Sequence, residues 1–297
     1  MATRQQEREQ QHGTDVRAPV GVFDSGVGGL TVLRELLREL PDERYLYFGD
    51  TGNCPYGPRG KDEIVTLSLA AGRWLLERGA KIIVVACNTA SVWARDELRA
   101  QLGNPAGVEV VAVVPPVKPA ARETRRRIIG VVATEAAAKG EHVRELIEQF
   151  APDMEVYTRG CPELVRLVEA GVLEGSEAEA AVRAEIGPML ARGIDVLVLG
   201  CTHFPAMRGA FERVAGPGVE VIDSGAAIAQ RVRYLLARDS LLAPPGVAAE
   251  EPRAPTGCDE FWCSGDAVRF SRVTSAILGH PVTARYAEGM LFAPAHV

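Results

Sequence analysis

Short apolar runs alternate along the chain with longer stretches whose apolar positions recur at helical spacing. The runs rich in branched residues predict buried strands at Val20–Phe23, Tyr45–Phe48, Lys81–Ala86, Val108–Val114, Ile128–Val132, Met154–Tyr157, Asp195–Leu199 and Val219–Ile222. The amphipathic stretches between them include Thr31–Leu40, Lys61–Arg78, Gly140–Phe150 and Ala178–Arg192, and a final strand and helix are expected within Glu260–Leu278. Buried strands separated by helices predict mainly parallel sheets covered on both faces, which is an α/β fold.

Two strand-end segments occur twice in the chain, in the same order and at nearly the same offset. Gly21–Gly26 resembles Gly130–Glu135, and Gly79–Thr89 resembles Gly193–His203. This ordered repetition predicts two similar doubly wound domains related by pseudo-symmetry. A third strand-end segment, Val221–Gly225, is expected to return the chain to the first domain. The alternative is a chance likeness between two generic strand–helix units.

The composition is that of a globular protein, with 297 residues of which 47% are hydrophobic. Apolar runs stay below the roughly 18 residues that a membrane helix needs, and the polar N-terminus lacks the apolar segment of a secretory signal. The net charge of −6 argues against general binding to nucleic acid or membrane surfaces. We therefore expect a cytoplasmic protein without either partner. Residues 1–18 offer little to bury and predict a disordered extension, and the Pro- and Ala-rich residues 243–256 predict a loop.

Cys87 and Cys201 each follow a predicted buried strand, at the carboxyl edge where ligands bind in open α/β sheets. A helix is expected to begin within a residue or two of each cysteine. Asn88 or Thr89 would cap the first helix, and Pro205 would suit the first turn of the second. Because a helix N-terminus lowers the pKa of a thiol, both thiols are expected to ionise readily. The alternative for either cysteine is a buried structural thiol.

Two thiols at equivalent strand ends of two similar domains could lie across one cleft. That arrangement suits removal of a proton from one face of a carbon and delivery of a proton to the other, so it favours racemisation over hydrolysis. The six cysteines include no C-x-x-C pair and no histidines at zinc spacing, so we expect neither a metal site nor a disulfide framework. Structural roles are assigned to the remaining cysteines, Cys54, Cys161, Cys258 and Cys263.

Three further segments carry candidate chemistry. Asp24 begins a glycine-rich turn that lacks the G-x-G-x-x-G spacing of dinucleotide sites, so its carboxylate could hold a substrate ammonium or tune a thiol. Its alternative role is a helix N-cap. His203 follows Cys201 by two residues and is a candidate proton partner, with a structural histidine as the alternative. The Pro- and Gly-containing loop at 54–60 offers Tyr56 and the Gly57 amide as candidate substrate contacts.

Taken in order, these segments resemble glutamate racemase, a branch of the aspartate/glutamate racemase superfamily. The matching segments are Phe23–Leu30, Gly49–Thr51, Cys54–Gly57, Ala86–Ala90, Ala133–Thr134, Leu199–Pro205 and Ile222–Asp223, with Ser264–Asp266 near the tail. The sequence Cys201-Thr202-His203 and the Asp24-Ser25-Gly26 turn resemble the glutamate branch more than the aspartate branch.

The resemblance implies cofactor-independent racemisation of L-glutamate to D-glutamate, which feeds peptidoglycan synthesis. Cys87 and Cys201 would exchange protons with opposite faces of the α-carbon, with Asp24 assisting Cys87 and His203 assisting Cys201. The substrate contacts that it implies are Asp24, Ser25, Tyr56, Gly57, Asn88, Thr89, Thr134, Thr202 and His203. It implies no metal and no cofactor, a small amino-acid substrate as partner, and it allows a homodimer.

The resemblance also implies a domain arrangement, with the active site in the cleft between two domains. The first domain would be discontinuous, with residues 19–113 and 222–297, and the second, with residues 114–221, would be inserted in it.

The chain departs from the family pattern at the turn that would meet the substrate side chain. Ala137 stands where the family often has a hydroxyl, and residues 135–138 differ from the usual Thr-rich turn. Racemisation of aspartate or another amino acid on the same scaffold is therefore an alternative. A one-cysteine decarboxylase or isomerase relative is a second alternative, which the presence of both Cys87 and Cys201 argues against. A non-catalytic ligand-binding module is the third, and the broken glycine spacing argues against a nucleotide ligand.

Overall fold

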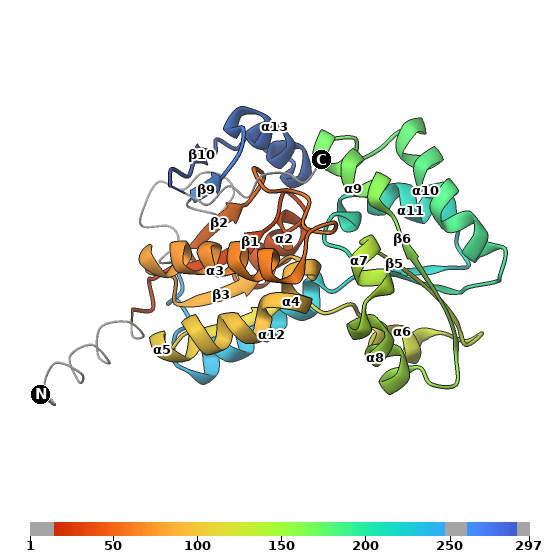
Figure 1. Cartoon of the computed structure of the whole chain (residues 1–297), viewed down its shortest axis with the longest axis horizontal. Helices are drawn as coiled ribbons and strands as arrows, with labels where there is room; N and C mark the ends of the chain where they lie inside the picture. The colour runs from red at the N-terminus through yellow and green to blue at the C-terminus, as the bar shows by residue number, and fades with distance from the viewer. Residues whose placement is uncertain (1–14, 247–259, 290–297) are drawn as a thin grey trace, which may run out of the picture. The chain divides into compact units, whose positions relative to one another are not determined.

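The computed structural model describes residues 15–246 and 260–289 (Figure 1). Contacts divide the chain into two compact units: unit 1 contains the chain up to Val113 and again from Gly225, and unit 2 contains Val114–Ser224. The return to unit 1 falls at Gly225, whereas the boundary expected from the sequence fell at residue 222. The cause is the last strand of unit 2, β8 (Glu220–Ile222), which pairs with β7 (Val196–Leu199) of the same unit.

Unit 1 is built on a six-stranded parallel sheet with the order β10-β9-β2-β1-β3-β4 among the described residues. Its strands are β1 (Val20–Asp24), β2 (Tyr45–Gly49), β3 (Ile82–Val85), β4 (Glu109–Ala112), β9 (Glu260–Cys263) and β10 (Arg285–Tyr286). All four residues of β3 and all five residues of β1 and β2 are buried, because helices cover both faces of the sheet.

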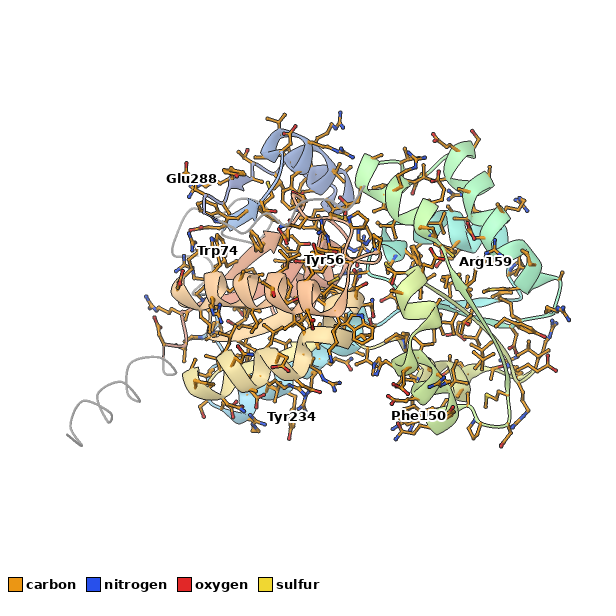
Figure 2. All side chains as sticks on the ribbon, viewed as in Figure 1. Tyr56, Trp74, Phe150, Arg159, Tyr234 and Glu288 are labelled. Carbon is orange, nitrogen blue, oxygen red and sulfur yellow. The ribbon has the colours of Figure 1, made fainter. Side chains whose placement is uncertain are left out.

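Two groups of helices cover the sheet of unit 1 (Figure 1). One face carries α3 (Lys61–Glu77) and α4 (Asn88–Leu98), which pack on each other; the other carries α2 (Leu30–Glu39), α12 (Gly225–Arg238) and α13 (Ala267–Leu278). A π-helical turn, η1 (Arg99–Gly103), and a short α5 (Asn104–Ala106) follow α4. Trp74 of α3, labelled in Figure 2, packs on Phe48 of β2 with ring centroids 5.0 Å apart.

Unit 2 is built on a four-stranded parallel sheet with the order β6-β5-β7-β8. Its first two strands are β5 (Ile128–Ala133) and β6 (Glu155–Gly160). Its helices are α6 (Val117–Glu123), α7 (Glu135–Lys139), α8 (Glu141–Phe150), α9 (Pro162–Ala170), α10 (Ser176–Leu190), the 3₁₀ helix η2 (Phe204–Met207) and α11 (Arg208–Ala215). A core forms where residues of α6 and α8 meet the apolar side chains of β5 and β7.

The two units repeat one strand topology. The order β2-β1-β3-β4 in unit 1 matches β6-β5-β7-β8 in unit 2, so β1 corresponds to β5 and β3 to β7. The register agrees as well, because Gly21 pairs with Ile83 and its counterpart Gly130 pairs with Leu197. The internal repeat seen in the sequence is therefore present in the hydrogen-bonding register of both sheets.

At the equivalent glycines Gly21 and Gly130, the segment that joins a helix to the next strand packs closely on the first strand of the repeat. A Cβ at Gly21 would lie 2.8 Å from the Ala80 Cβ, and a Cβ at Gly130 would lie 2.8 Å from the Ile194 Cδ1. Ala80 and Ile194 occupy equivalent places, directly after the left-handed glycine that ends each repeat's helix. The repeat therefore includes this close contact, which comes shortly before the strand that leads to each cysteine.

The α/β class with mainly parallel sheets is confirmed, since every strand pair in the two sheets is parallel. The expected strands agree with the observed ones to within one or two residues, except that β6 continues to Gly160 as an edge strand with polar residues. Of the expected N-terminal extension, residues 1–14 lie outside the described residues, as do residues 247–256 of the expected loop. Among the described residues, the structure contains no helix long and apolar enough to cross a membrane.

Candidate active site

Cys87 lies at the junction between β3 and α4, where it is the N-cap residue with extended backbone angles. Its carbonyl accepts the first helical hydrogen bond, from the Ser91 amide at 2.8 Å. The expectation that Asn88 or Thr89 caps this helix is wrong, because both residues lie inside its first turn. The Oδ1 of Asn88, the residue after Cys87, is buried and has no hydrogen-bond partner among the described residues, so this acceptor is available to a ligand.

The Cys87 thiol is 5% exposed and lies 3.4 Å from the Ser25 hydroxyl. Burial raises the pKa of Cys87 to about 12, and the charge of Asp24 acts in the same direction. Hydrogen bonds from Ser25 and from the Ala90 amide oppose this shift without reversing it. The expected lowering of this pKa by the helix N-terminus is therefore wrong, since loss of hydration outweighs the helix dipole. A thiol with this pKa is protonated near neutral pH.

Asp24 ends β1 and is completely buried. Its Oδ1 accepts a hydrogen bond from the Gly26 amide at 2.7 Å, and α2 begins only at Leu30 with Gly29 as its N-cap. The alternative role of Asp24 as an N-cap is thus excluded. Gly29 allows the turn to fold back on the strand, because a Cβ there would lie 2.7 Å from the Asp24 Cβ. The glycine-rich turn serves close packing around the carboxylate.

Tyr56 and Gly57 lie in the loop between β2 and α3. Tyr56 is 1% exposed and donates a hydrogen bond of 2.6 Å to Asp50 Oδ2, whereas Gly57 is half-buried. Apart from the family resemblance, no feature of the sequence distinguishes Asp50, since an aspartate after a strand is common in turns.

In unit 2, Cys201 follows β7 by two residues, as Cys87 follows β3. Cys201, Thr202 and His203 are buried. The helix expected here begins at Phe204 as a 3₁₀ turn, η2, with Pro205 in its first turn, and α11 follows directly from Arg208. The hydrogen bonds of this turn join residues three positions apart, as in a 3₁₀ helix; the Phe204 amide, for example, donates to the Cys201 carbonyl at 3.1 Å. Cys201 therefore precedes a 3₁₀ turn and does not cap an α-helix.

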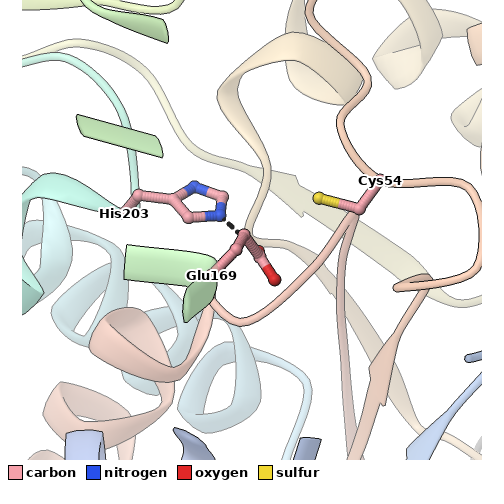
Figure 3. A group of neighbouring side chains, drawn as sticks. All are labelled: Cys54, Glu169 and His203. Carbon is pink, nitrogen blue, oxygen red and sulfur yellow. Dashed lines mark hydrogen bonds and ion pairs between the residues drawn. The ribbon is translucent and has the colours of Figure 1, made fainter. Parts of the chain in front are cut away.

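His203 connects Cys201 to a carboxylate that the sequence did not identify. The Cys201 Sγ lies 3.6 Å from His203 Nδ1. Figure 3 shows the other side of the ring, where His203 Nε2 lies 2.6 Å from Glu169 Oε1. With Glu169 as a carboxylate, His203 Nε2 is the donor, and Nδ1 of the neutral ring then faces the thiol without a hydrogen. Glu169 lies on α9, and nothing in the sequence distinguishes it from other glutamates on amphipathic helices.

Thr134 follows β5 and is the N-cap of α7, where its hydroxyl accepts a bond from the Ala137 amide at 3.3 Å. In the repeat, Thr134 corresponds to Ser25, the residue whose hydroxyl contacts the Cys87 thiol. Ala137, where the family often has a hydroxyl, thus contributes its backbone to this cap. Each unit carries one cysteine and one hydroxyl residue at equivalent strand ends on the carboxyl edge of its sheet.

The other described cysteines have different surroundings. Cys161 and Cys263 are buried thiols and Cys54 is half-exposed, and all five described cysteines are free. Burial raises the pKa of both Cys161 and Cys263, as it does that of Cys87. Cys258 lies outside the described residues.

A repeated parallel α/β unit with a buried cysteine after the same strand defines the class of protein. The chain belongs to the Asp/Glu/Hydantoin racemase family, whose model matches residues 21–232. Among its relatives, the glutamate racemase of Herpetosiphon aurantiacus is 43% identical over 259 residues, which are 87% of this chain and 97% of that protein. That of Stutzerimonas stutzeri is 41% identical over 265 residues, which are 89% of this chain and 96% of that protein.

Solved structures agree with this membership. The Escherichia coli glutamate racemase in complex with L-glutamate and the activator UDP-MurNAc-Ala has a TM-score of 0.76 and 34% identity, covering 91% of this chain and 97% of that one. The Francisella tularensis glutamate racemase in complex with D-glutamate has a TM-score of 0.74 and 26% identity, covering 92% and 97%. The resemblance drawn from the sequence is confirmed, and so is the prediction of an isomerase.

Proposed function

We propose that this chain interconverts L-glutamate and D-glutamate by proton transfer at the α-carbon, with Cys87 and Cys201 as the two proton-transfer residues. The observation that carries the proposal is the pair of buried thiols at equivalent strand ends of a repeated unit. Related glutamate racemases with L-glutamate and with D-glutamate bound support the choice of substrate. As a cytoplasmic enzyme, it would supply D-glutamate for peptidoglycan synthesis.

In the proposed step, one cysteine acts as a thiolate and removes the α-hydrogen as a proton. The C–H electron pair stays on the α-carbon and is delocalised into the carboxylate, while the other cysteine donates its thiol proton to the opposite face. The two thiols exchange protonation states in each turnover, so the reverse reaction begins from the product state. The mechanism requires both thiols to reach one substrate, from opposite faces of its α-carbon. No cofactor takes part in it.

The neighbours of each thiol support distinct assisting roles. Asp24 would assist Cys87, and the high pKa of that thiol makes its thiolate a strong base once it forms. The positive α-ammonium group of the substrate would favour that thiolate. His203 would assist Cys201, because its Nδ1 faces the sulfur at 3.6 Å and its ring is held by Glu169. The unpartnered Asn88 Oδ1 would accept a hydrogen bond from the ammonium.

The remaining proposed substrate contacts are hydroxyls and amides near these strand ends. They are Ser25, Tyr56, Gly57, Thr89, Thr134 and Thr202. Neutral donors in a dry site stabilise charge that develops on the substrate carboxylate. Because Ala137 replaces a hydroxyl that the family often has, we assign no side-chain donor for the γ-carboxylate at that position.

Incubation with L-glutamate in deuterated water tests the proposal, since the D-glutamate formed should carry deuterium at the α-carbon. Cys87→Ser and Cys201→Ser should each nearly abolish racemisation, because each direction needs one base and one acid. Cys263→Ser is the matched control, because Cys263 is a buried cysteine at the end of β9, and this variant should keep wild-type turnover. If both single variants racemise glutamate like the wild type, the two-thiol mechanism is wrong. A panel of other amino acids in the same assay decides the substrate.

A further inference from the structure

The loop that carries Tyr56 is organised around one buried carboxylate, that of Asp50. Asp50 follows β2 directly and is 1% exposed, and Figure 2 labels Tyr56 in the same loop. Asp50 Oδ2 accepts the Tyr56 hydroxyl hydrogen at 2.6 Å. Asp50 Oδ1 accepts bonds from the Ser264 hydroxyl at 2.5 Å and from the Asn53 side-chain amide at 2.9 Å. Three side chains therefore converge on one carboxyl group.

The other hydrogen bonds of each side chain in this cluster decide which group donates to Asp50. The Ser264 Oγ accepts the Gly52 amide hydrogen at 2.9 Å, which leaves its own hydrogen for Asp50. The Asn53 Nδ2 atom can only donate. An ionised Asp50 carboxylate can accept both of these hydrogen bonds, and the Tyr56 hydroxyl donates the third. Burial raises the pKa of Asp50 above its usual value, and the bonds from Ser264, Tyr56 and Asn53 oppose this shift without reversing it.

A phenol has one hydrogen, so a tyrosine that donates to a carboxylate presents only lone pairs to any second partner. We propose that Asp50 is a positioning residue of the racemase site that commits the Tyr56 hydrogen and thereby makes Tyr56 a hydrogen-bond acceptor toward the substrate. An acceptor in a dry site recognises the α-ammonium group and disfavours a carboxylate. The inference rests on the proposed function, in which Tyr56 contacts the amino acid.

The charges around Tyr56 are consistent with this role. Burial, the charge of Asp50 and the bond to Asp50 raise the pKa of Tyr56 well above its usual value, and the charge of Asp24 and, once its thiol ionises, that of Cys87 add to this. Tyr56 therefore stays protonated, and its hydroxyl donates the hydrogen bond to Asp50. The phenol lies near enough to Cys87 and Asp24, both in unit 1, for a negative charge on either to act on it.

The position of Asp50 is fixed by the turn after β9. Besides the Ser264 bond, the Gly265 amide donates to the Thr51 hydroxyl at 3.1 Å, and a Cβ at Gly265 would lie 2.7 Å from that oxygen. This turn belongs to the segment Ser264–Asp266, which matched the family pattern near the tail. These contacts anchor the loop that carries Asp50 and Tyr56.

Steady-state kinetics with glutamate test the proposal through a double-mutant cycle. Asp50→Asn should raise KM roughly tenfold, the effect of one hydrogen bond to a charged group, while kcat changes by less than about threefold. In a Tyr56→Phe background, Asp50→Asn should have no further effect on KM, because it acts through the tyrosine hydroxyl. Additive effects of the two substitutions on KM would overturn the proposal.

Two control variants separate positioning from simple destabilisation. Asp195→Asn is the matched control, because the Asp195 carboxylate likewise accepts a hydroxyl, that of Thr124 at 2.5 Å, and the amides of Arg125 and Arg126 at the opposite end of β7. It should leave KM unchanged. Ser264→Ala loosens the anchor but keeps the carboxylate, so KM should stay within about threefold of wild type. An increase equal to that of Asp50→Asn would assign the effect to loop anchoring.

Carbon-13 NMR of ring-labelled tyrosine provides a readout that does not depend on turnover. The Tyr56 signal, assigned by its loss in Tyr56→Phe, should report a lower pKa in Asp50→Asn than in the wild type. In the wild type and in Ser264→Ala, the Tyr56 hydroxyl hydrogen should exchange slowly with solvent, a measurement that needs no Asp50 variant. An unchanged tyrosine pKa or a rapidly exchanging hydroxyl would contradict the proposal. A lowered pKa in an enzyme that fails to racemise glutamate would instead refute the proposed function.

Discussion

The protonation state of Cys87 gives a quantitative prediction about its reactivity. Its pKa of about 12 leaves about one molecule in 10,000 as thiolate near pH 8. An ordinary cysteine with a pKa of about 8.5 is roughly one quarter thiolate there. Because alkylation proceeds through the thiolate, iodoacetamide should modify Cys87 roughly 2,000-fold more slowly than an ordinary cysteine, before any steric protection is counted.

Peptide mapping by mass spectrometry after timed alkylation measures this rate, with the half-exposed Cys54 as internal reference. Between about pH 7 and pH 10 the rate at Cys87 should rise about tenfold per pH unit without reaching a plateau, as expected for a thiol that titrates near 12. Steric burial alone would slow the reaction but leave a plateau near the ordinary cysteine pKa. A plateau of that kind would refute the assignment of a protonated resting thiol.

Removal of the Asp24 charge tests the cause of the shift. Asp24→Asn should speed alkylation of Cys87, because the Asp24 carboxylate raises the pKa of that thiol. Asp96→Asn is the control, since Asp96 is exposed at the far end of the same helix and binds Arg95. It should leave the rate unchanged. Equal rates in Asp24→Asn and wild type would show that the carboxylate does not act on the thiol.

Other consequences concern stability and the second thiol. Cys87 stays protonated in the folded chain between about pH 9 and pH 12, whereas the same cysteine ionises in the unfolded chain. The free energy of unfolding should therefore fall over this range, by at most about 1.4 kcal/mol per pH unit. Urea titrations measure this fall, which should be shallower in Cys87→Ser. Glu169→Gln keeps an acceptor for His203 but removes its charge, so kcat/KM should drop roughly tenfold, and an unchanged value would exclude a role for the carboxylate. Gly21→Ala should lower the thermal unfolding midpoint more than Gly130→Ala does. The new methyl group meets the fixed Cβ of Ala80 in the first variant and the movable Cδ1 of Ile194 in the second. Equal decreases in the midpoint would contradict this explanation.

Much of the fold follows from local sequence pattern. The apolar runs before Cys87 and Cys201 are strands because they are short, branched and bounded by turns, and these properties are read within a few residues. The repeat was visible for the same reason, since the pairing register of Gly21 and Gly130 depends on spacing along each strand. The sequence therefore determined the class of fold and the two places where thiols follow buried strands.

The protonation and the hydrogen-bond partners of the side chains at these strand ends were decided only by the tertiary structure. Cys87 has a raised pKa because packing removes water from the sulfur, an effect that opposes the helix N-terminus visible in the sequence. Glu169 reaches His203 across 34 positions, and Ser264 reaches Asp50 across 214. Spacing along the chain carries no information about such contacts, because folding sets which polar groups share a dry environment and therefore where each hydrogen resides.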